Sequence, residues 1–437
     1  MENKQKILII GGGGREHAIG WKIAQSPRCG ELFFASGNGG TASLGTNLDI
    51  KGTEIEKLID FVKKEKIDLT LAIPDDPLAL GIVDEFQKEN LRIFGPTKKA
   101  AQLESSKAYS KNFMARNKLP TAKFETFTEI NEALAYLEKQ SLPIVIKASG
   151  LALGKGVIIA QTFDEAKEAL ENILVKKVFG EAGNEVVIEE FLTGPEISIH
   201  AFSDGKTFSM FPTSQDHKRV GEGDAGPNTG GMGTIAPLPF INDEIFNNIK
   251  EEIVSKTLDA MNKENNPFIG VIYPGLMLTS DGPKILEYNV RFGDPETETY
   301  MRLLETDLLD IVDACIDQKL SELEIKWKNI SACTVILASG GYPGNYEKGK
   351  IISGINEADP SNSSGLKKTN NVVVFHAGTK YDESGNLITN GGRVLGISAI
   401  GENLEEALAT VYEAVSTISF EGMQYRKDIG RKTLLIK

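Results

Sequence analysis

The apolar positions of the first hundred residues come in short runs that amphipathic stretches separate. A continuous apolar run such as Lys6–Ile10 is typical of a parallel strand that is buried on both faces. The same pattern predicts further strands at Leu32–Ala35, Leu69–Ile73 and Leu91–Phe94. It predicts intervening helices at Arg15–Gln25, Glu54–Glu65 and Leu78–Gln87. This alternation predicts a doubly wound α/β unit.

A second region runs from about Thr97 to Leu320 and mixes both kinds of pattern. It predicts helices at Ala100–Asn117 and Asp164–Leu174, and strands at Ile144–Lys147, Val186–Phe191 and Lys284–Val290. A long glycine-rich polar stretch, Gln215–Gly233, interrupts this region.

A third region begins near Ser331 and is mostly strand-like, at Cys333–Ala338, Val372–Ala377 and Arg393–Ala399. One helix follows, which Asn403 caps in a capping-box pattern with Glu406. Its apolar face is formed by Leu404, Leu408, Val411, Val415 and Ile418. The chain is therefore expected to be a multidomain protein of α/β and α+β architecture.

Size and charge limit the classes of partner. The 437 residues suggest roughly three domains. The formal net charge of -13 makes nucleic acid and anionic membranes unfavourable as general partners. We see no signal peptide and no apolar run near the ~20 residues of a membrane helix, and the three cysteines are widely spaced. A cytoplasmic protein without nucleic-acid or membrane partners is expected.

The first candidate site is the glycine run Gly11–Gly14, which lies between a predicted strand and a predicted helix. A dinucleotide fingerprint needs a third glycine where Glu16 stands, and the second strand ends at Ala35–Gly37 without an acidic residue. A dehydrogenase is therefore disfavoured. A site for a smaller phosphorylated substrate and a tight turn without a ligand both remain open.

The second candidate is the segment Pro143–Val157, a strand carrying Lys147 followed by a glycine loop with Gly154 and Lys155. It is not a P-loop, because the glycines are too closely spaced and Gly156 replaces the magnesium-binding Ser or Thr. A hairpin of this kind is able to fold over triphosphate oxygens. The alternative is a solvated hairpin tip.

The third candidate is the alternating stretch Lys284–Arg291. Period two places Glu287, Asn289 and Arg291 on one face, and Asp294 follows in a tight turn. The first two side chains offer oxygen ligands for magnesium, and the guanidinium suits a carboxylate or a phosphate. The alternative is a half-exposed edge strand.

Segments along nearly the whole chain resemble the phosphoribosylamine–glycine ligases, ATP-grasp enzymes of purine synthesis. The most specific are Gln215-Asp-His-Lys-Arg219 and Arg291-Phe-Gly-Asp-Pro-Glu296. The others are Gly11–Ala18, Gly95–Lys107, Lys147–Gly156, Glu189–Glu196, Asn228–Gly233, Ser339–Gly344 and Phe375–Thr379. The chain departs from the family at Ile73–Asp75, where Gly-Pro-Glu is usual, and at Glu298, where Gln is frequent.

The resemblance implies a Rossmann-like N-terminal substrate domain at residues 1–103. It implies an ATP-grasp domain at 104–328, with a small lid at about 122–193, and a β-rich C-terminal domain at 329–437. The implied reaction is the ATP-dependent ligation of glycine to phosphoribosylamine through glycyl phosphate, which gives glycinamide ribonucleotide, ADP and phosphate. A monomer is expected.

The resemblance also implies which residues form the site. ATP would contact Lys107, Lys147, Gly154, Lys155, Glu189, Glu190, Phe191, Leu192 and Glu196. Glu287 and Asn289 would hold Mg²⁺ or Mn²⁺. The substrates would lie against Gly13, Gly14, Arg15, Asp216 and Arg291, and the catalytic groups would be Arg291, Asp294, Lys218 and Asp216.

Three other functions compete with this one. A carboxylase of the same superfamily that uses bicarbonate would share the lysines and the metal strand. A nucleotide-binding regulatory protein without turnover would not need all of these groups. A dehydrogenase is disfavoured by Glu16.

Overall fold

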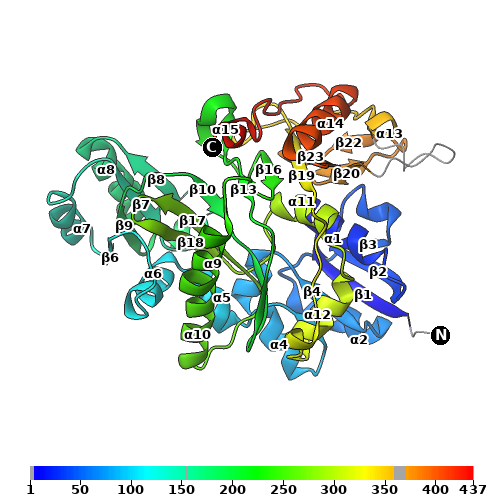
Figure 1. The fold of residues 1–437 in the computed structure, drawn as a ribbon, viewed down its shortest axis with the longest axis horizontal. Helices are drawn as coiled ribbons and strands as arrows, with labels where there is room; N and C mark the ends of the chain where they lie inside the picture. Colours follow the sequence, from blue (N-terminus) through cyan, green and yellow to red (C-terminus); the bar gives the residue numbers. More distant parts are fainter. Residues whose placement is uncertain (1–3, 153–155, 359–370, 437) are drawn as a thin grey trace.

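The computed structural model describes residues 4–152, 156–358 and 371–436. In Figure 1 the N-terminal sheet lies at the lower right, the segment predicted as a lid projects at the left, and the C-terminal sheet with α14 (Leu404–Thr417) lies at the top. The expected combination of α/β and α+β units is confirmed.

The N-terminal unit is a five-stranded parallel sheet in the order β3-β2-β1-β4-β5. Its strands are β1 (Gln5–Gly11), β2 (Cys29–Ser36), β3 (Thr46–Leu48), β4 (Leu69–Ala72) and β5 (Ile93–Phe94), with helices α1 (Gly14–Ile23) and α2 (Ile55–Glu65). The side chains from Ile7 to Ile10 are fully buried, as a parallel strand covered on both faces requires.

Two helices predicted as continuous are each divided in two. The predicted bounds of the helix Leu78–Gln87 were wrong, because two helices, α3 (Asp75–Leu80) and α4 (Ile82–Lys88), occupy this stretch. They are separated by Gly81, whose φ of 95° is left-handed and ends α3. Ala100–Asn117 is divided by Ser106 into α5 (Lys98–Ser105) and α6 (Lys107–Arg116). The Ser106 hydroxyl accepts a bond from the Tyr109 N–H and caps α6, which starts at Lys107.

The lid is an antiparallel sheet in the order β6-β9-β7-β8. Its strands are β6 (Phe124–Phe127), β9 (Val186–Glu190), β7 (Ile144–Ala148) and β8 (Val157–Ala160), and its helices are α7 (Ile130–Leu137) and α8 (Phe163–Leu170). A π-helix, Glu171–Val175, replaces the end of the predicted helix Asp164–Leu174. The lid has its own apolar core.

A second antiparallel sheet forms the body of the middle region. It runs β10-β17-β11-β12, with β18 on β17. Its strands are β10 (Glu196–Ser198), β11 (Ala201–Asp204), β12 (Phe208–Met210), β17 (Ile269–Thr279) and β18 (Gly282–Asn289), and α9 (Asp243–Ile249), α10 (Lys256–Lys263), α11 (Glu296–Leu303) and α12 (Leu308–Ile316) belong to the same region.

The C-terminal sheet takes two strands from the middle of the chain. Its order is β13-β16-β19-β23-β20. The strands are β13 (Gln215–Asp216), β16 (Gly233–Ala236), β19 (Ser331–Ala338), β23 (Arg393–Gly401) and β20 (Val372–His376), and the helices include α14 (Leu404–Thr417) and α15 (Arg431–Leu435). The glycine-rich polar stretch Gln215–Gly233 thus starts in β13 and ends at the first residue of β16. The hairpin of β14 (Arg219–Gly221) and β15 (Ala225–Asn228) also lies inside it.

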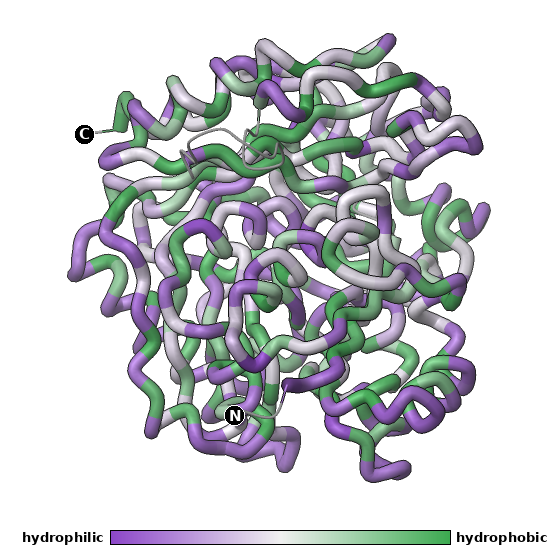
Figure 2. The backbone as a smooth tube through the Cα atoms, turned by 90° about the vertical axis from the view of Figure 1, so that its right-hand side faces the viewer, coloured by the Kyte–Doolittle hydropathy of each residue, from purple (hydrophilic) through white to green (hydrophobic). Residues whose placement is uncertain are grey.

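The apolar segments of the chain lie mainly in the interior, and the polar segments lie mainly on the outer loops and helices (Figure 2). The Asn403 cap is confirmed, since its side chain accepts a bond from the Glu406 N–H. Glu406 accepts in return from Glu402 rather than from the cap residue. No helix among the described residues is long and apolar enough to cross a membrane.

Candidate active site

The predicted metal strand is β18, and its pairing with β17 places Glu287 opposite Gly275 and Asn289 opposite Tyr273. The two side chains are therefore two positions apart on one face. No group of three or more His, Cys, Asp or Glu side chains suited to a metal occurs within the described ranges. One carboxylate and one amide oxygen nevertheless fit a Mg²⁺ ion that takes its other ligands from phosphates and water.

Arg291, just beyond β18, is held on several sides. Its Nη2 lies 2.9 Å from Glu104 Oε1 and donates to Asn289 Oδ1 at 3.0 Å, and its Nη1 donates to the Phe292 carbonyl. Glu104 Oε2 accepts from the Val290 N–H at 2.8 Å. Arg291 Nε is buried and has no hydrogen-bond partner among the described residues. One donor of a fixed guanidinium is thus free for an anion.

Three lysines from separate parts of the chain act on the charge of Glu287. Burial alone would raise the pKa of Glu287, but the charges of Lys218, Lys147 and Lys107 outweigh it and lower the pKa to about 2. Lys218 Nζ lies 3.5 Å from Glu287 and 2.5 Å from Glu196. The carboxylate is therefore ionised, as a metal ligand must be, and the charges of the three lysines favour further negative charge beside it.

The side chain of Glu189 is buried between two lysines. It is 2% exposed and lies 2.5 Å from both Lys147 and Lys111, the latter a buried lysine of α6. Burial lowers the pKa of Lys111 to about 8 although Glu189 opposes the shift. Only the backbone of Glu189 is thus available to an adenine, whereas Phe191, just beyond β9, is exposed.

The predicted ATP contacts do not all lie within the described residues. Lys107 starts α6 and donates to the Gly150 carbonyl at 3.3 Å, and Glu190 accepts from the Lys123 N–H. Leu192 is half-buried after β9. Gly154 and Lys155 lie outside the described residues.

Asp216, at the end of β13, is a carboxyl group with no ion-pair partner in the part of the chain that the structure describes. Its Oδ1 is buried and has no hydrogen-bond partner among the described residues. Burial and the nearby Glu296 raise its pKa well above the ordinary value. Gly231 packs so closely that a Cβ there would lie 2.6 Å from Asp216 Oδ1. The site therefore favours a bound cation at Asp216.

Asp294 is paired with a residue that the sequence analysis missed. Arg393, at the start of β23, lies 2.9 Å from Asp294 Oδ1 and donates to the carbonyl groups of Asp294 and Gly230. Nearby Glu298 is 1% exposed, and burial, followed by the charge of Asp294, raises its pKa well above the ordinary value. The C-terminal sheet thus supplies a cation to this side of the site.

The glycine turn at the start of α1 is internally bonded. The Gly13 N–H donates to Glu16 Oε2 at 2.6 Å, and Arg15 donates to Glu16 Oε1 and to the Phe292 carbonyl. A Cβ on Gly14 would lie 2.4 Å from Glu298 Oε1. A phosphate at Gly13 and Arg15 would therefore have to displace Glu16.

The structure brings together side chains from four elements around β18, and several of them carried no local signal. Glu104, Lys111 and Arg393 lie far from β18 in the sequence and in ordinary helical or strand patterns. Their contacts with the site are seen only in the folded structure. Glu104 lies within a segment that carried the family resemblance, but nothing there pointed to its pairing with Arg291.

Three parts of the chain match family models. These are described as phosphoribosylglycinamide synthetase, N domain, at residues 5–104, its ATP-grasp (A) domain at residues 105–297, and its C domain at residues 332–432. The chain is 48% identical over 432 residues to the phosphoribosylamine–glycine ligase of Vibrio parahaemolyticus, with 98% of each chain covered.

Solved structures give the same result. The phosphoribosylamine–glycine ligase of Thermotoga maritima has a TM-score of 0.82 and 37% identity, covering 97% of this chain and 99% of that one. The biotin carboxylase domain of Hydrogenobacter thermophilus 2-oxoglutarate carboxylase, at a TM-score of 0.73 and 15% identity, covers 100% of this chain and 94% of that one and shares the fold. The matches confirm the resemblance seen in the sequence.

Proposed function

The chain belongs to the phosphoribosylglycinamide synthetase family, and on that premise we propose that it ligates glycine to phosphoribosylamine at the expense of ATP. The products are glycinamide ribonucleotide, ADP and phosphate, a step of purine biosynthesis. The family's ATP-grasp domain implies the use of ATP and a divalent metal. We propose Mg²⁺ as that metal, held by Glu287 and Asn289.

The observation that carries the proposal is that Lys218 Nζ lies 3.5 Å from Glu287, while the charges of Lys147 and Lys107 also lower the pKa of this carboxyl group. Such a set of cations around one carboxylate suits a metal–triphosphate. When bound, the divalent cation would offset the charge of the phosphate oxygens. The lysines would neutralise the rest, and the β9 backbone with Glu196 would hold adenine and ribose.

The first step joins glycine to the γ-phosphoryl group. A carboxylate oxygen of glycine attacks the γ-phosphorus, the bond to the bridging oxygen breaks, and ADP leaves. Arg291 would orient the glycine carboxylate through its free Nε. Asp216 would take the ammonium group, and its raised pKa would return toward the ordinary value beside that charge.

The second step forms the amide. The amine of phosphoribosylamine attacks the acyl carbon of glycyl phosphate, the carbon–oxygen bond to phosphate breaks, and the nitrogen loses a proton to the departing phosphate. Arg291 would stabilise the oxyanion that develops on the acyl oxygen. Lys218 is placed to neutralise the departing phosphate. Phosphoribosylamine would lie between the N-terminal sheet, the Gly13–Arg15 turn and the Asp294–Arg393 pair.

Monomeric function in the cytoplasm, without nucleic-acid or membrane partners, is part of the same proposal. The net charge of -13 disfavours nucleic-acid and anionic membrane partners, and the three free cysteines, Cys29, Cys315 and Cys333, suit the cytoplasm. Light scattering at micromolar concentration would contradict the monomer if it gave twice the mass of 47.5 kDa. The domain bounds at residues 103 and 328 likewise stay a prediction.

The proposal is tested by ADP release from ATP, Mg²⁺, glycine and freshly generated phosphoribosylamine, with one component left out at a time. We expect release only when glycine and phosphoribosylamine are both present. Release with bicarbonate instead would reassign the substrate to that of a carboxylase. No release with any acid and amine would favour a nucleotide-binding protein without turnover.

A further inference from the structure

The loop Gln215–Gly233 carries Asp216 and Lys218, and its two ends are strands of the C-terminal sheet. β13 pairs with β16, and β16 pairs with β19. Inside the loop, Thr229 donates both its N–H and its hydroxyl to the Lys218 carbonyl, at 2.7 and 2.8 Å. The position of Lys218 therefore depends on how this loop is held.

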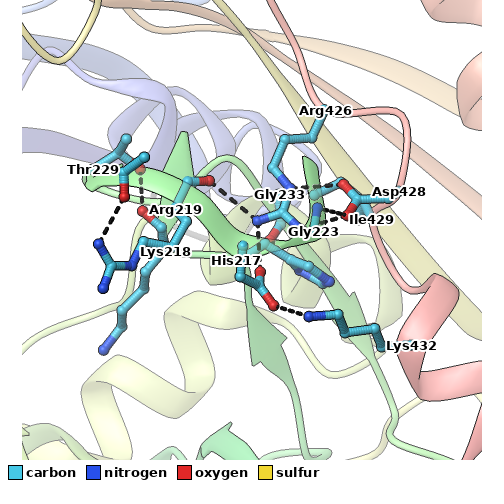
Figure 3. A network of polar contacts seen from close by, with 12 residues as sticks. His217, Lys218, Arg219, Gly223, Thr229, Gly233, Arg426, Asp428, Ile429 and Lys432 are labelled. Carbon is cyan, nitrogen blue, oxygen red and sulfur yellow. Dashed lines mark hydrogen bonds and ion pairs between the residues drawn. The ribbon is translucent and has the colours of Figure 1, made fainter. Parts of the chain in front are cut away.

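A segment from the far end of the chain, residues 424–433, lies against this loop (Figure 3). We call it the clasp. Its central residue is Arg426, which is 1% exposed. The Nε and Nη2 of Arg426 donate to the two carboxylate oxygens of Asp428, each at 2.8 Å. Its Nη1 donates across to the loop, to the Arg219 carbonyl at 3.2 Å and to Asp224 Oδ1 at 2.9 Å.

Asp428 completes the same contact from the other side, since its Oδ2 accepts from the Gly223 N–H at 2.8 Å. The bidentate Arg426–Asp428 pair is thus one rigid unit that binds three loop positions. The exposed Lys432 pairs with the other oxygen of Asp224. Removing one charged partner of such a buried guanidinium would leave its charge uncompensated.

His217 provides a second, uncharged link between loop and clasp. Its Nδ1 lies 3.0 Å from the Gly233 carbonyl, and its Nε2 accepts from the Gly430 N–H at 3.1 Å. Burial, followed by the charge of Arg426, lowers the pKa of His217 to about 4, so the ring is neutral at pH 7. One tautomer, with the proton on Nδ1, satisfies both bonds. Both nitrogens are used within the protein, so His217 is not free for catalysis.

We propose that Arg426 is a positioning residue of the active site, which holds the loop so that Lys218 reaches Glu196 and Glu287. The inference rests on the proposed ligase function and deepens it. Lys218 and Asp216 flank His217 in the sequence, so a shift of the His217 link displaces both groups. A displacement of about 1 Å at a reacting group lowers a rate on the order of 10²-fold.

The test compares Arg426→Met and Arg426→Lys with a matched control, Lys432→Gln, which removes an exposed cation of the same clasp. We expect kcat to fall at least about ten-fold in Arg426→Met. Arg426→Lys should recover only part of the loss, because lysine cannot form the bidentate pair. Lys432→Gln should keep the parent kcat and the parent KM for ATP, because exposed ion pairs contribute little.

Amide hydrogen exchange of residues 217–229 in the folded protein provides the second readout, which does not depend on activity. Exchange in this loop should be faster in Arg426→Met and unchanged in the lid. Asp224→Asn, at a partly exposed position, tests the same contact if Arg426→Met does not fold, and it should speed exchange and lower kcat in the same direction.

The proposal would be overturned if these variants kept the kcat and the loop exchange rates of the parent protein. A loss of activity without faster exchange in the loop would also overturn it. If the parent protein had no ligase activity, the proposed function would fail. The exchange result would then still decide whether the clasp orders the loop.

Discussion

The pair of Glu104 and Arg291 allows the tightest test of how the site is held. It joins the end of α5 to the residue just beyond β18. The side chains are 9% and 17% exposed, and the shortest distance between nitrogen and oxygen is 2.9 Å. Glu104→Gln keeps the shape and the acceptor for the Val290 N–H but removes the charge that Arg291 faces.

The size of the effect follows from burial. Removing one partner of a buried pair costs roughly 3–5 kcal/mol, because the other charge is left uncompensated. Arg291 keeps two neutral acceptors, Asn289 Oδ1 and the Phe292 carbonyl. We therefore expect a loss of about 2–3 kcal/mol in the free energy of unfolding. The KM for glycine should rise about ten-fold as the guanidinium loses its fixed orientation.

The assay combines urea titration with glycine kinetics, and Glu264→Gln is the matched control. Glu264 makes a two-bond pair with Arg116 at 2.7 Å, but these side chains are 27% and 42% exposed. An exposed pair should contribute less than about 1 kcal/mol, with no change in the KM for glycine. Equal stability losses in the two variants, together with an unchanged glycine KM, would refute the reasoning.

Three further predictions concern the metal, the nucleotide and pH. The double variant Glu287→Gln, Asn289→Ala should need at least about ten-fold more Mg²⁺ for half-maximal rate, and a normal Mg²⁺ titration would contradict the metal assignment. Lys147→Met should raise the KM for ATP about ten-fold or more, whereas substitution of the exposed Lys176 by Met should not. An equal KM for ATP in the two variants would contradict a role of Lys147 in phosphate binding. Because burial raises the pKa of Glu298 above its ordinary value of 4.5, folding opposes ionisation and stability falls as pH rises above that value. Glu298→Gln cannot ionise, so its melting temperature should exceed the parent's at pH 8 and match it near pH 4, and a difference independent of pH would contradict this.

Local patterns predicted the parts of the fold that depend on neighbours in sequence. The period of two correctly placed Glu287 and Asn289 on one face, and the side chain of Asn403 caps α14 as expected. The helix breaks at Gly81 and Ser106 were missed, although both residues are typical of helix ends.

Contacts between distant segments could not be predicted from periodicity. Arg393 meets Asp294 across 99 positions, and Arg426 meets Asp224 across 202. Strand β16 joins the C-terminal sheet although the surrounding stretch is polar and rich in glycine. Each of these pairings depends on the tertiary fold and leaves no period in the local sequence.

The central claim is that the carboxylate of glycine becomes an acyl phosphate before the amide forms. The most direct test uses glycine labelled with ¹⁸O in both carboxylate oxygens, together with ATP, Mg²⁺ and phosphoribosylamine, followed by mass analysis of the released phosphate. The account predicts one ¹⁸O atom in each phosphate and one left in the glycinamide ribonucleotide. Unlabelled phosphate alongside normal product would contradict it.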